Sequence, residues 1–366
     1  MNFVRALVQT FAAPGQERRL RSAADLVEAG LLAPDEATAA AEAASLLPIA
    51  ITPHLAGLID PADAHDPIAR QFVPSADELR TDDGEIADPI GDRSHSPVEG
   101  IVHRYPDRVL LTPVMACPVY CRFCFRRETV GAGALTSAQL DAALGYVRAH
   151  PEIREVILSG GDPLALSPRG LRAIVGALGA IAHVETIRIH SRVPVADPGR
   201  ITPALVAALK ADTPVWVVLH CNHARELGDE ARAAVRALVD NGIPMLAQTV
   251  LLMGVNDDAA TLEALMRALV RNRIKPYYLH HGDLARGTGH FRTSLASGRA
   301  LMKALRGRLS GIAQPTYVLD IPGGHGKVPA GAAYLTPEPA PGVWTVEDWQ
   351  GRPHIYREAE GGDAGI

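Results

Sequence analysis

Residues 108–124 read Arg-Val-Leu-Leu-Thr-Pro-Val-Met-Ala-Cys-Pro-Val-Tyr-Cys-Arg-Phe-Cys. The first seven residues form a short, largely apolar run that predicts a buried β-strand. Three thiols follow within eight positions, at Cys117, Cys121 and Cys124. This strand opens a series of strand and helix patterns, so the stretch both begins the predicted fold and locates a candidate site.

Short apolar runs and helical patterns alternate from this strand to about residue 309. Six strand–helix units in succession predict a parallel sheet with helices packed on it. Most of the strands end in polar or glycine residues, which favours a barrel over an open doubly wound sheet with one switch point. Six units rather than eight predict a partial (βα)6 TIM-like α/β barrel, open along one side. The units are 108–114 with 137–150, 155–159 with 168–180, 185–190 with 203–211, 215–220 with 229–241, 244–252 with 259–273, and 274–281 with 294–309.

The chain on either side of these units has a different pattern. Residues 1–100 are predicted to form a helical N-terminal region that continues into an extended wrapping segment, and residues 101–312 the partial barrel. Residues 313–366 are predicted to form a short C-terminal segment with a strand, a glycine loop and a hairpin. The corresponding stretches are helices over 23–29 and 34–46, an extended segment over 48–100, a strand over 316–319 and a hairpin around 343–356.

Composition and charge exclude several classes of function. The net charge is −5 and no stretch concentrates Lys and Arg, so no nucleic-acid partner is expected. No apolar run approaches the roughly 18–20 residues that span a bilayer, and the first residues, Met-Asn-Phe-Val-Arg, lack the ordered regions of a secretory signal. Three cysteines so close together do not make a disulfide framework. We expect a cytoplasmic protein, without a membrane partner, whose cysteines are ligands.

Thiolates are soft ligands that suit either zinc or an iron–sulfur cluster. Structural zinc normally takes four ligands in two pairs, and Cys221, the one other cysteine, stands alone about a hundred residues away. Three cysteines leave one iron of a 4Fe–4S cluster open, and that iron can chelate the amino and carboxylate groups of S-adenosylmethionine (SAM). The spacing favours the cluster, while a zinc site and incidental buried thiols remain the alternatives.

The Cys-x3-Cys-x2-Cys spacing after the first strand of a partial barrel resembles the signature of the radical SAM superfamily. The run Ser159-Gly160-Gly161-Asp162, at the end of the second predicted strand, is similar to the glycine motif that meets the amino end of SAM in that superfamily. His220 and Gln248, at later strand ends, are candidate contacts for its ribose or adenine.

From about residue 51 to 329 the chain resembles the lysine 2,3-aminomutase family, which uses pyridoxal 5′-phosphate (PLP) besides the cluster and SAM. The resemblance makes Lys327 the catalytic lysine that forms a Schiff base with PLP. It makes Arg104 and Arg108 the ligands of the PLP phosphate. The matching stretches are 103–108, 121–127, 158–162, 188–194, 248–257, 275–278, Asp283, 289–293 and 319–329.

The resemblance also assigns a substrate. Arg126 matches the arginine that holds the substrate carboxylate, while Asp283 and Asp320 match two carboxylates that hold the ε-ammonium of lysine. A buried cation needs compensating negative charge, so this pair suits a cationic side chain. The implied reaction is abstraction of a hydrogen by a 5′-deoxyadenosyl radical and 1,2-migration of the amino group, which converts L-lysine to β-lysine. An electron donor such as flavodoxin or ferredoxin is implied.

The chain departs from the longer members of this family. It has no cysteine after Cys221, and Asp258 stands where those members place a zinc cysteine, so any homo-oligomer is expected to form without structural zinc. The branch that makes β-lysine for elongation factor P, and a 2,3-aminomutase for another amino acid, remain alternatives. A ferredoxin-like carrier would leave Lys327 unexplained, and a PLP-dependent racemase or eliminase would not need the three cysteines.

Overall fold

A computed structural model describes residues 19–359, and within them one curved sheet of nine strands forms the body of the molecule. The segment Met1–Arg5, examined above for a secretory signal, lies outside the described residues. In the part of the chain that the structure describes, no helix is long and apolar enough to cross a membrane.

The strands of the sheet follow one another in chain order, from β1 to β9. Strands β2 to β8 run parallel, and β1 and β9 pair antiparallel at the two edges. The partial barrel predicted from the sequence is confirmed, although the sequence patterns did not separate out β1 or β9. The strands are β1 (Ile101–Tyr105), β2 (Arg108–Val114), β3 (Glu155–Gly160), β4 (Thr186–Ser191), β5 (Val215–His220), β6 (Met245–Val250), β7 (Ile274–His280), β8 (Thr316–Asp320) and β9 (Lys327–Pro329).

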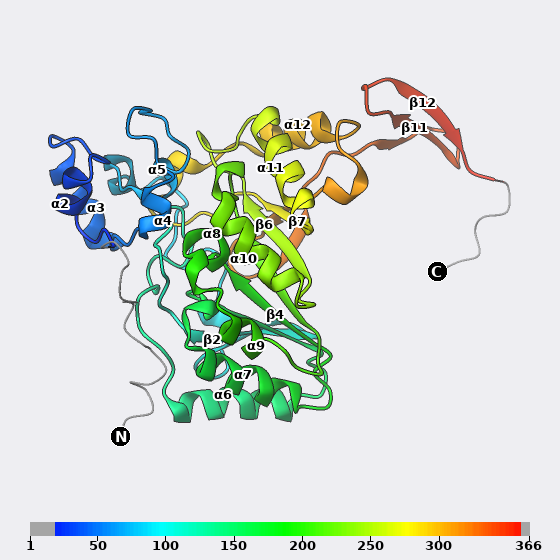
Figure 1. The fold of residues 1–366 in the computed structure, drawn as a ribbon. Coiled ribbons are helices and arrows are strands. Elements are labelled where there is room, and N and C mark those ends of the chain that lie inside the picture. The colour runs from blue at the N-terminus through cyan, green and yellow to red at the C-terminus, as the bar shows by residue number, and fades with distance from the viewer. Residues whose placement is uncertain (1–18, 360–366) are drawn as a thin grey trace.

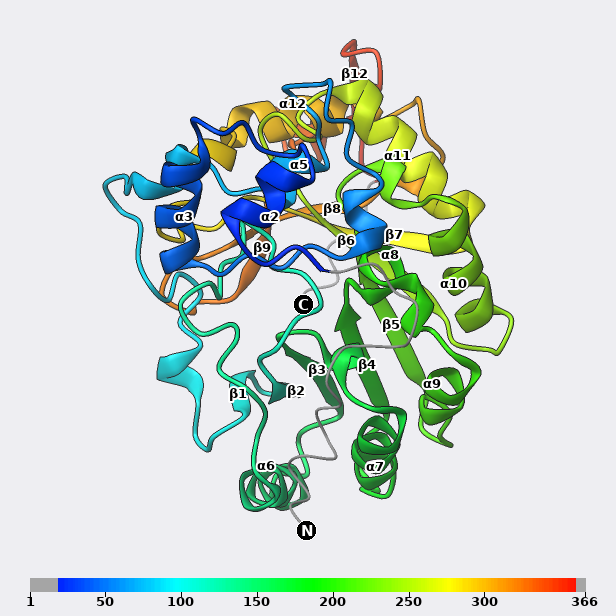
Figure 2. The same ribbon diagram turned by 60° about the vertical axis from the view of Figure 1, so that its left-hand side comes forward.

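The connecting helices lie along the outer side of the curved sheet (Figure 2). Most of them begin at a side-chain cap, such as Ser167, which accepts from the backbone N–H of Gly170 before α7. Each turns an apolar face inward, and these faces and the strands form one continuous core. The helices are α6 (Ser137–Ala149), α7 (Pro168–Gly179), α8 (Val193–Ala196), α9 (Pro203–Ala208), α10 (Asp229–Val239), α11 (Ala259–Arg271) and α12 (Leu295–Leu305), with 3₁₀ helices η3 (Pro163–Ala165), η4 (Pro198–Arg200), η5 (Ala224–Glu226), η6 (Gly289–Phe291) and η7 (Gly311–Ala313).

The N-terminal region packs on the barrel through its own small apolar core, which includes Val119 of the cysteine loop. Buried ion pairs fasten it further: Glu78 binds Arg122 at 2.6 Å and Arg127 at 2.9 Å. The segment expected to be extended instead contains several short helices. The elements are α2 (Ala23–Glu28), α3 (Ala37–Leu46), α4 (Pro53–Ala56), α5 (Ala69–Phe72), η1 (Ala76–Leu79) and η2 (Arg93–His95).

A second, three-stranded antiparallel sheet follows the barrel and stands away from it in Figure 1. The hairpin expected around 343–356 is present, and a short additional strand extends it. The strands are β10 (Leu335–Pro337), β11 (Val343–Glu347) and β12 (Pro353–Arg357).

Candidate active site

A cavity of about 890 Å³ occupies the interior of the barrel, near the upper end of the range for ligand pockets. Every residue singled out from the sequence as a site residue lines this cavity. They are Arg104, Arg108, Cys117, Cys121, Cys124, Arg126, Ser159, Gly160, Gly161, Asp162, His220, Gln248, Asp283, Asp320 and Lys327. Cys221 is buried outside the cavity lining, and its thiol donates to the carbonyl oxygen of His223 at 3.5 Å.

The three cysteines lie on the loop that leaves β2. A turn brings the last two together, since the N–H of Cys124 donates to the carbonyl oxygen of Cys121 at 3.0 Å. None of the three is in a disulfide, and burial raises the pKa of each thiol, that of Cys124 to about 11. Three free, partly exposed cysteines that line one cavity fit the open-iron cluster predicted from their spacing.

The glycine turn after β3 supports the start of the cysteine loop. The N–H of Gly161 donates to the carbonyl oxygen of Val114 at 2.9 Å, and that of Asp162 donates to Ala116 at 3.0 Å. A Cβ at Gly161 would lie 2.4 Å from the carbonyl oxygen of Ala116, so only glycine fits this approach. The buried carboxylate of Asp162 accepts from the backbone N–H of Arg192 at 2.7 Å. The turn therefore ties together the ends of three neighbouring strands.

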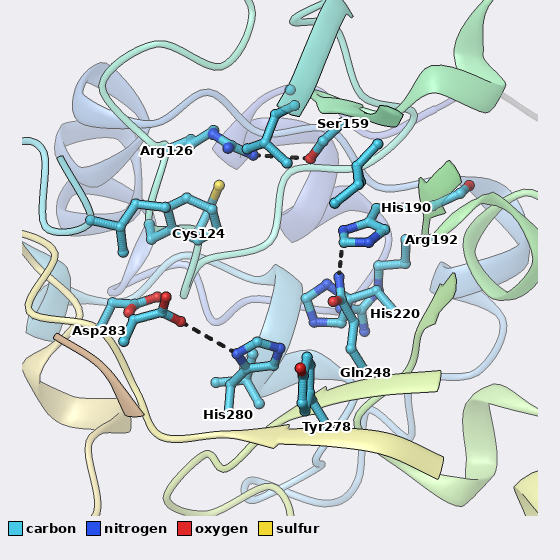
Figure 3. A pocket seen from close by; sticks show the side chains of 18 of the residues that line it. Cys124, Arg126, Ser159, His190, Arg192, His220, Gln248, Tyr278, His280 and Asp283 are labelled. Atoms are coloured by element: carbon cyan, nitrogen blue, oxygen red, sulfur yellow. Dashed lines mark hydrogen bonds and ion pairs between the residues drawn. The ribbon is translucent and has the colours of Figure 1, made fainter. Parts of the chain in front are cut away.

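Histidine rings line another side of the cavity (Figure 3). The Nε2 atoms of His190 and His220 are buried and have no partner within the described residues. Burial lowers the pKa of both rings well below the usual value, so they are neutral at pH 7. Gln248 Nε2 lies 3.5 Å from His190 Nδ1. These unused polar atoms suit a ligand that offers its own donors and acceptors, such as an adenosine group.

Arg126 and Arg104 share one carboxylate. Asp92 accepts from Arg126 Nε at 2.8 Å through one oxygen and from Arg104 at 3.0 Å through the other. Arg126 also donates to Ser159 Oγ at 3.1 Å. Asp92 could not be singled out from the sequence, because it lies in a segment without periodicity, 12 positions from Arg104 and 34 from Arg126.

At another side of the cavity, two acidic residues lie near one lysine. The ammonium of Lys327 donates to both oxygens of Asp320, at 2.5 and 2.6 Å, and His280 Nδ1 lies 3.6 Å from the same carboxylate. Burial raises the pKa of Asp320, but the bonds from His280 and Lys327 outweigh it and hold that pKa at about 2. Burial, and then the charge of Asp320, raise the pKa of Asp283 to about 7. The two carboxylates are thus held in different protonation states at slightly acid pH.

The backbone around Lys327 is fixed from the β1–β2 hairpin. Its N–H donates to Tyr105 Oη at 2.7 Å, and the guanidinium of Arg108 stacks 3.8 Å from the centre of the Tyr105 ring. Gly326 takes a left-handed φ of 92°, a conformation that glycine adopts without strain. Arg104 Nε is buried with no partner in the described chain, so a donor remains available beside this hairpin.

Comparison with known proteins agrees with the resemblance noted in the sequence. Residues 111–265 match the model of the radical SAM superfamily. The chain is 40% identical to L-lysine 2,3-aminomutase of Fusobacterium nucleatum, over 94% of this chain and 81% of the relative. It is 43% identical to L-lysine 2,3-aminomutase of Clostridium subterminale, over 83% and 74% respectively. The chain belongs to the lysine 2,3-aminomutase family.

Members of this family are isomerases, and the radical SAM superfamily implies a 4Fe–4S cluster and SAM. Related aminomutases differ in their substrate. The chain is also 37% identical to glutamate 2,3-aminomutase of Clostridioides difficile, over 83% of this chain and 72% of that relative. The side chains that face the substrate must therefore decide between them.

Proposed function

We propose that this chain is a lysine 2,3-aminomutase that converts L-lysine to β-lysine with a 4Fe–4S cluster on Cys117, Cys121 and Cys124, SAM and PLP. The observation that carries the choice of lysine is the environment of Asp320. Its carboxylate already accepts two hydrogen bonds from a primary ammonium, that of Lys327. The ε-ammonium of lysine is the same chemical group, and Asp283 adds a second carboxylate for it.

The opposite end of the substrate is proposed to bind Arg126. This guanidinium is held by Asp92 and Ser159, so its orientation is fixed before an amino acid arrives. A carboxylate would accept from it in a charge-assisted pair. A glutamate side chain would instead bring a third carboxylate toward Asp283 and Asp320, and that repulsion argues against glutamate as substrate.

The residues present fit PLP. We propose that Lys327 attaches it and that Arg104 and Arg108 bind its phosphate, using the free buried donor of Arg104. PLP supplies the π-bond through which an amino group can migrate, and the cluster with SAM supplies the radical. Attachment through Lys327 would withdraw its ammonium from Asp320, so the substrate ammonium could take the same place.

The side chains of the cavity are proposed to bind and orient the substrate and cofactors and to exclude water from them. The His190, His220 and Gln248 side is proposed to hold the adenosine part of SAM, near the glycine turn at 159–162. We further propose a cytoplasmic location, a low-potential donor such as flavodoxin or ferredoxin, and no structural zinc in any homo-oligomer.

The test is anaerobic incubation of the iron-loaded protein with dithionite, SAM, PLP and either L-lysine or L-glutamate, followed by chiral analysis of the products. We expect β-lysine from L-lysine and no product from L-glutamate, and the configuration separates the elongation factor P-linked branch from the others. Unrearranged lysine with accumulation of 5′-deoxyadenosine would show that the substrate is wrong.

Attachment of PLP has its own test, by borohydride reduction and peptide mapping. The label should appear on Lys327 and be lost in Lys327→Ala. Lys275→Ala is the matched control, because Lys275 lies outside the cavity lining and donates to two backbone carbonyl oxygens. A label that persists in Lys327→Ala would remove the proposed role of this lysine.

A further inference from the structure

Arg192, just after β4, is a buried cation whose position is fixed by the fold. Its side chain is 6% exposed, and its Nη2 atom donates to Glu226 Oε2 and to Gln71 Oε1, each at 2.6 Å. The other oxygen of Glu226 accepts from two backbone N–H groups, of Asn222 and His223, each at 2.9 Å. The carboxylate is therefore as firmly placed as the guanidinium.

The remaining terminal nitrogen of Arg192 points to the cysteine loop. Its Nη1 atom donates to the sulfur of Cys121 at 3.6 Å. The guanidinium also lies 4.7 Å from the centre of the Phe72 ring and 5.6 Å from that of Phe123. Aromatic rings and an ion pair on its other sides hold the cation beside this sulfur.

Neither Arg192 nor Glu226 has a part in the proposed binding of substrate or PLP. Arg192 lines the cavity near the cysteines, while Glu226 is fully buried behind it. A buried ion pair is seldom a source of stability by itself, because removing two charges from water is costly. The hydrogen bond from Arg192 to Cys121, a candidate cluster ligand, means that this ion pair can affect the properties of the cluster.

We propose that Arg192 raises the reduction potential of the cluster through its hydrogen bond to Cys121, and that Glu226 acts in the opposite direction. This inference rests on the proposed cluster at the three cysteines. Reduction adds one electron, from the low-potential donor, and no proton, so the cluster and its thiolates gain one negative charge. A fixed cation on a ligand sulfur stabilises that reduced form, and a fixed anion behind it destabilises the same form. Arg192 is thus a positioning residue that acts on the cluster through Cys121.

Substitution of Arg192 and substitution of Glu226 are expected to shift the reduction potential in opposite directions. A purely structural role for the pair would not produce shifts of opposite sign. Arg192→Gln removes the cation and leaves Glu226 buried nearby, so the cluster should become harder to reduce. Glu226→Gln removes the anion and leaves Arg192 on the sulfur, so the cluster should become easier to reduce. We expect each variant to change the ratio of reduced to oxidised cluster at least tenfold at a fixed solution potential, which for one electron is a shift of about 59 mV.

The experiment is an anaerobic potentiometric titration of the reconstituted full chain, with the reduced cluster followed by electron paramagnetic resonance. Arg188→Gln is the matched control: Arg188 lies on β4, the strand that Arg192 follows, is 12% exposed and pairs with Glu155 at 2.5 Å. It precedes Arg192 by four residues, about 13 Å along a strand. Its substitution should shift the midpoint by much less than that of Arg192.

Measurement of iron and sulfide content distinguishes failure of the proposed cluster site from failure of the proposed effect of Arg192 and Glu226. A wild-type chain that binds no cluster would overturn the cluster site and this inference together. A normal cluster with unchanged midpoints in both variants, or with shifts of the same sign, would overturn the inference alone. If Arg192→Gln does not fold, Glu226→Gln still decides the sign. Where Arg192→Gln does fold, Arg192→Lys, which keeps the positive charge on a shorter side chain, should give a midpoint closer to that of the wild type than Arg192→Gln does.

Discussion

Protonation of Asp283 should control how well the site binds a substrate whose side chain is a cation. Its pKa is raised to about 7 by burial and by the charge of Asp320, with Lys327 and Arg126 acting in the opposite direction. A carboxyl group with this pKa is about nine-tenths ionised at pH 8 and about one-tenth ionised at pH 6. The ε-ammonium of lysine keeps its proton across this range. Because only the ionised carboxyl attracts that ammonium, apparent affinity should fall about tenfold from pH 8 to pH 6.

The assay is the KM for L-lysine between pH 6 and pH 8.5, for the wild type and two variants. Asp283→Asn should raise KM at pH 8 and lose most of its pH dependence. Asp320→Asn should keep a pH dependence, since Asp320, with a pKa of about 2, is ionised throughout. Its inflection should move below pH 7, because the charge that helps to raise the pKa of Asp283 is gone. An Asp283→Asn enzyme with the same pH profile as the wild type would refute the reasoning.

Three further substitutions, two of them with a matched control, test the structure directly. Cys117→Ala should abolish iron binding on reconstitution, whereas Cys221→Ala should retain it, as measured by iron content. Gly161→Ala should lower the melting temperature, at a cost of roughly 1–3 kcal/mol for a Cβ placed 2.4 Å from a backbone carbonyl. Gly176→Ala, in α7 with nothing within 4 Å, should not lower it. Glu78→Gln should reduce the free energy of unfolding by about 3–5 kcal/mol in denaturant titrations, because two buried arginines lose their partner.

The barrel could be predicted because its signals are local. The run at 108–114 became β2 with the predicted bounds, and the Ser-Pro pair at 167–168 begins α7 at a cap. Asp258, noted in the sequence for replacing a zinc cysteine, proves to be the cap of α11 and accepts from Ala260 and Thr261. Strand ends carry the site, so residues near them could also be singled out.

What could not be predicted depends on contacts between distant residues. Strand β9 has three residues, and its antiparallel pairing with β8 is needed to recognise it as part of the sheet. Asp92 and Gln71, in a segment without periodicity, contact arginines that line the cavity, and Gln71 contacts Arg192 across 121 positions. Arg192 stood in a polar strand end, but its contact with a sulfur could not be read from spacing.

The acidic residues of the N-terminal segment determine whether the barrel can be produced without that segment. Glu78 binds Arg122, Glu85 binds Arg292 at 2.5 Å, and Asp66 contacts Arg225 at 2.7 Å. In each pair the anion comes from the segment and the cation from the barrel. A chain that starts after residue 100 would therefore leave these guanidinium groups without counter-charges, that of the buried Arg122 included. We expect the barrel expressed without the N-terminal segment to be unstable. Proteolytic removal of that segment from the full chain should likewise inactivate the enzyme.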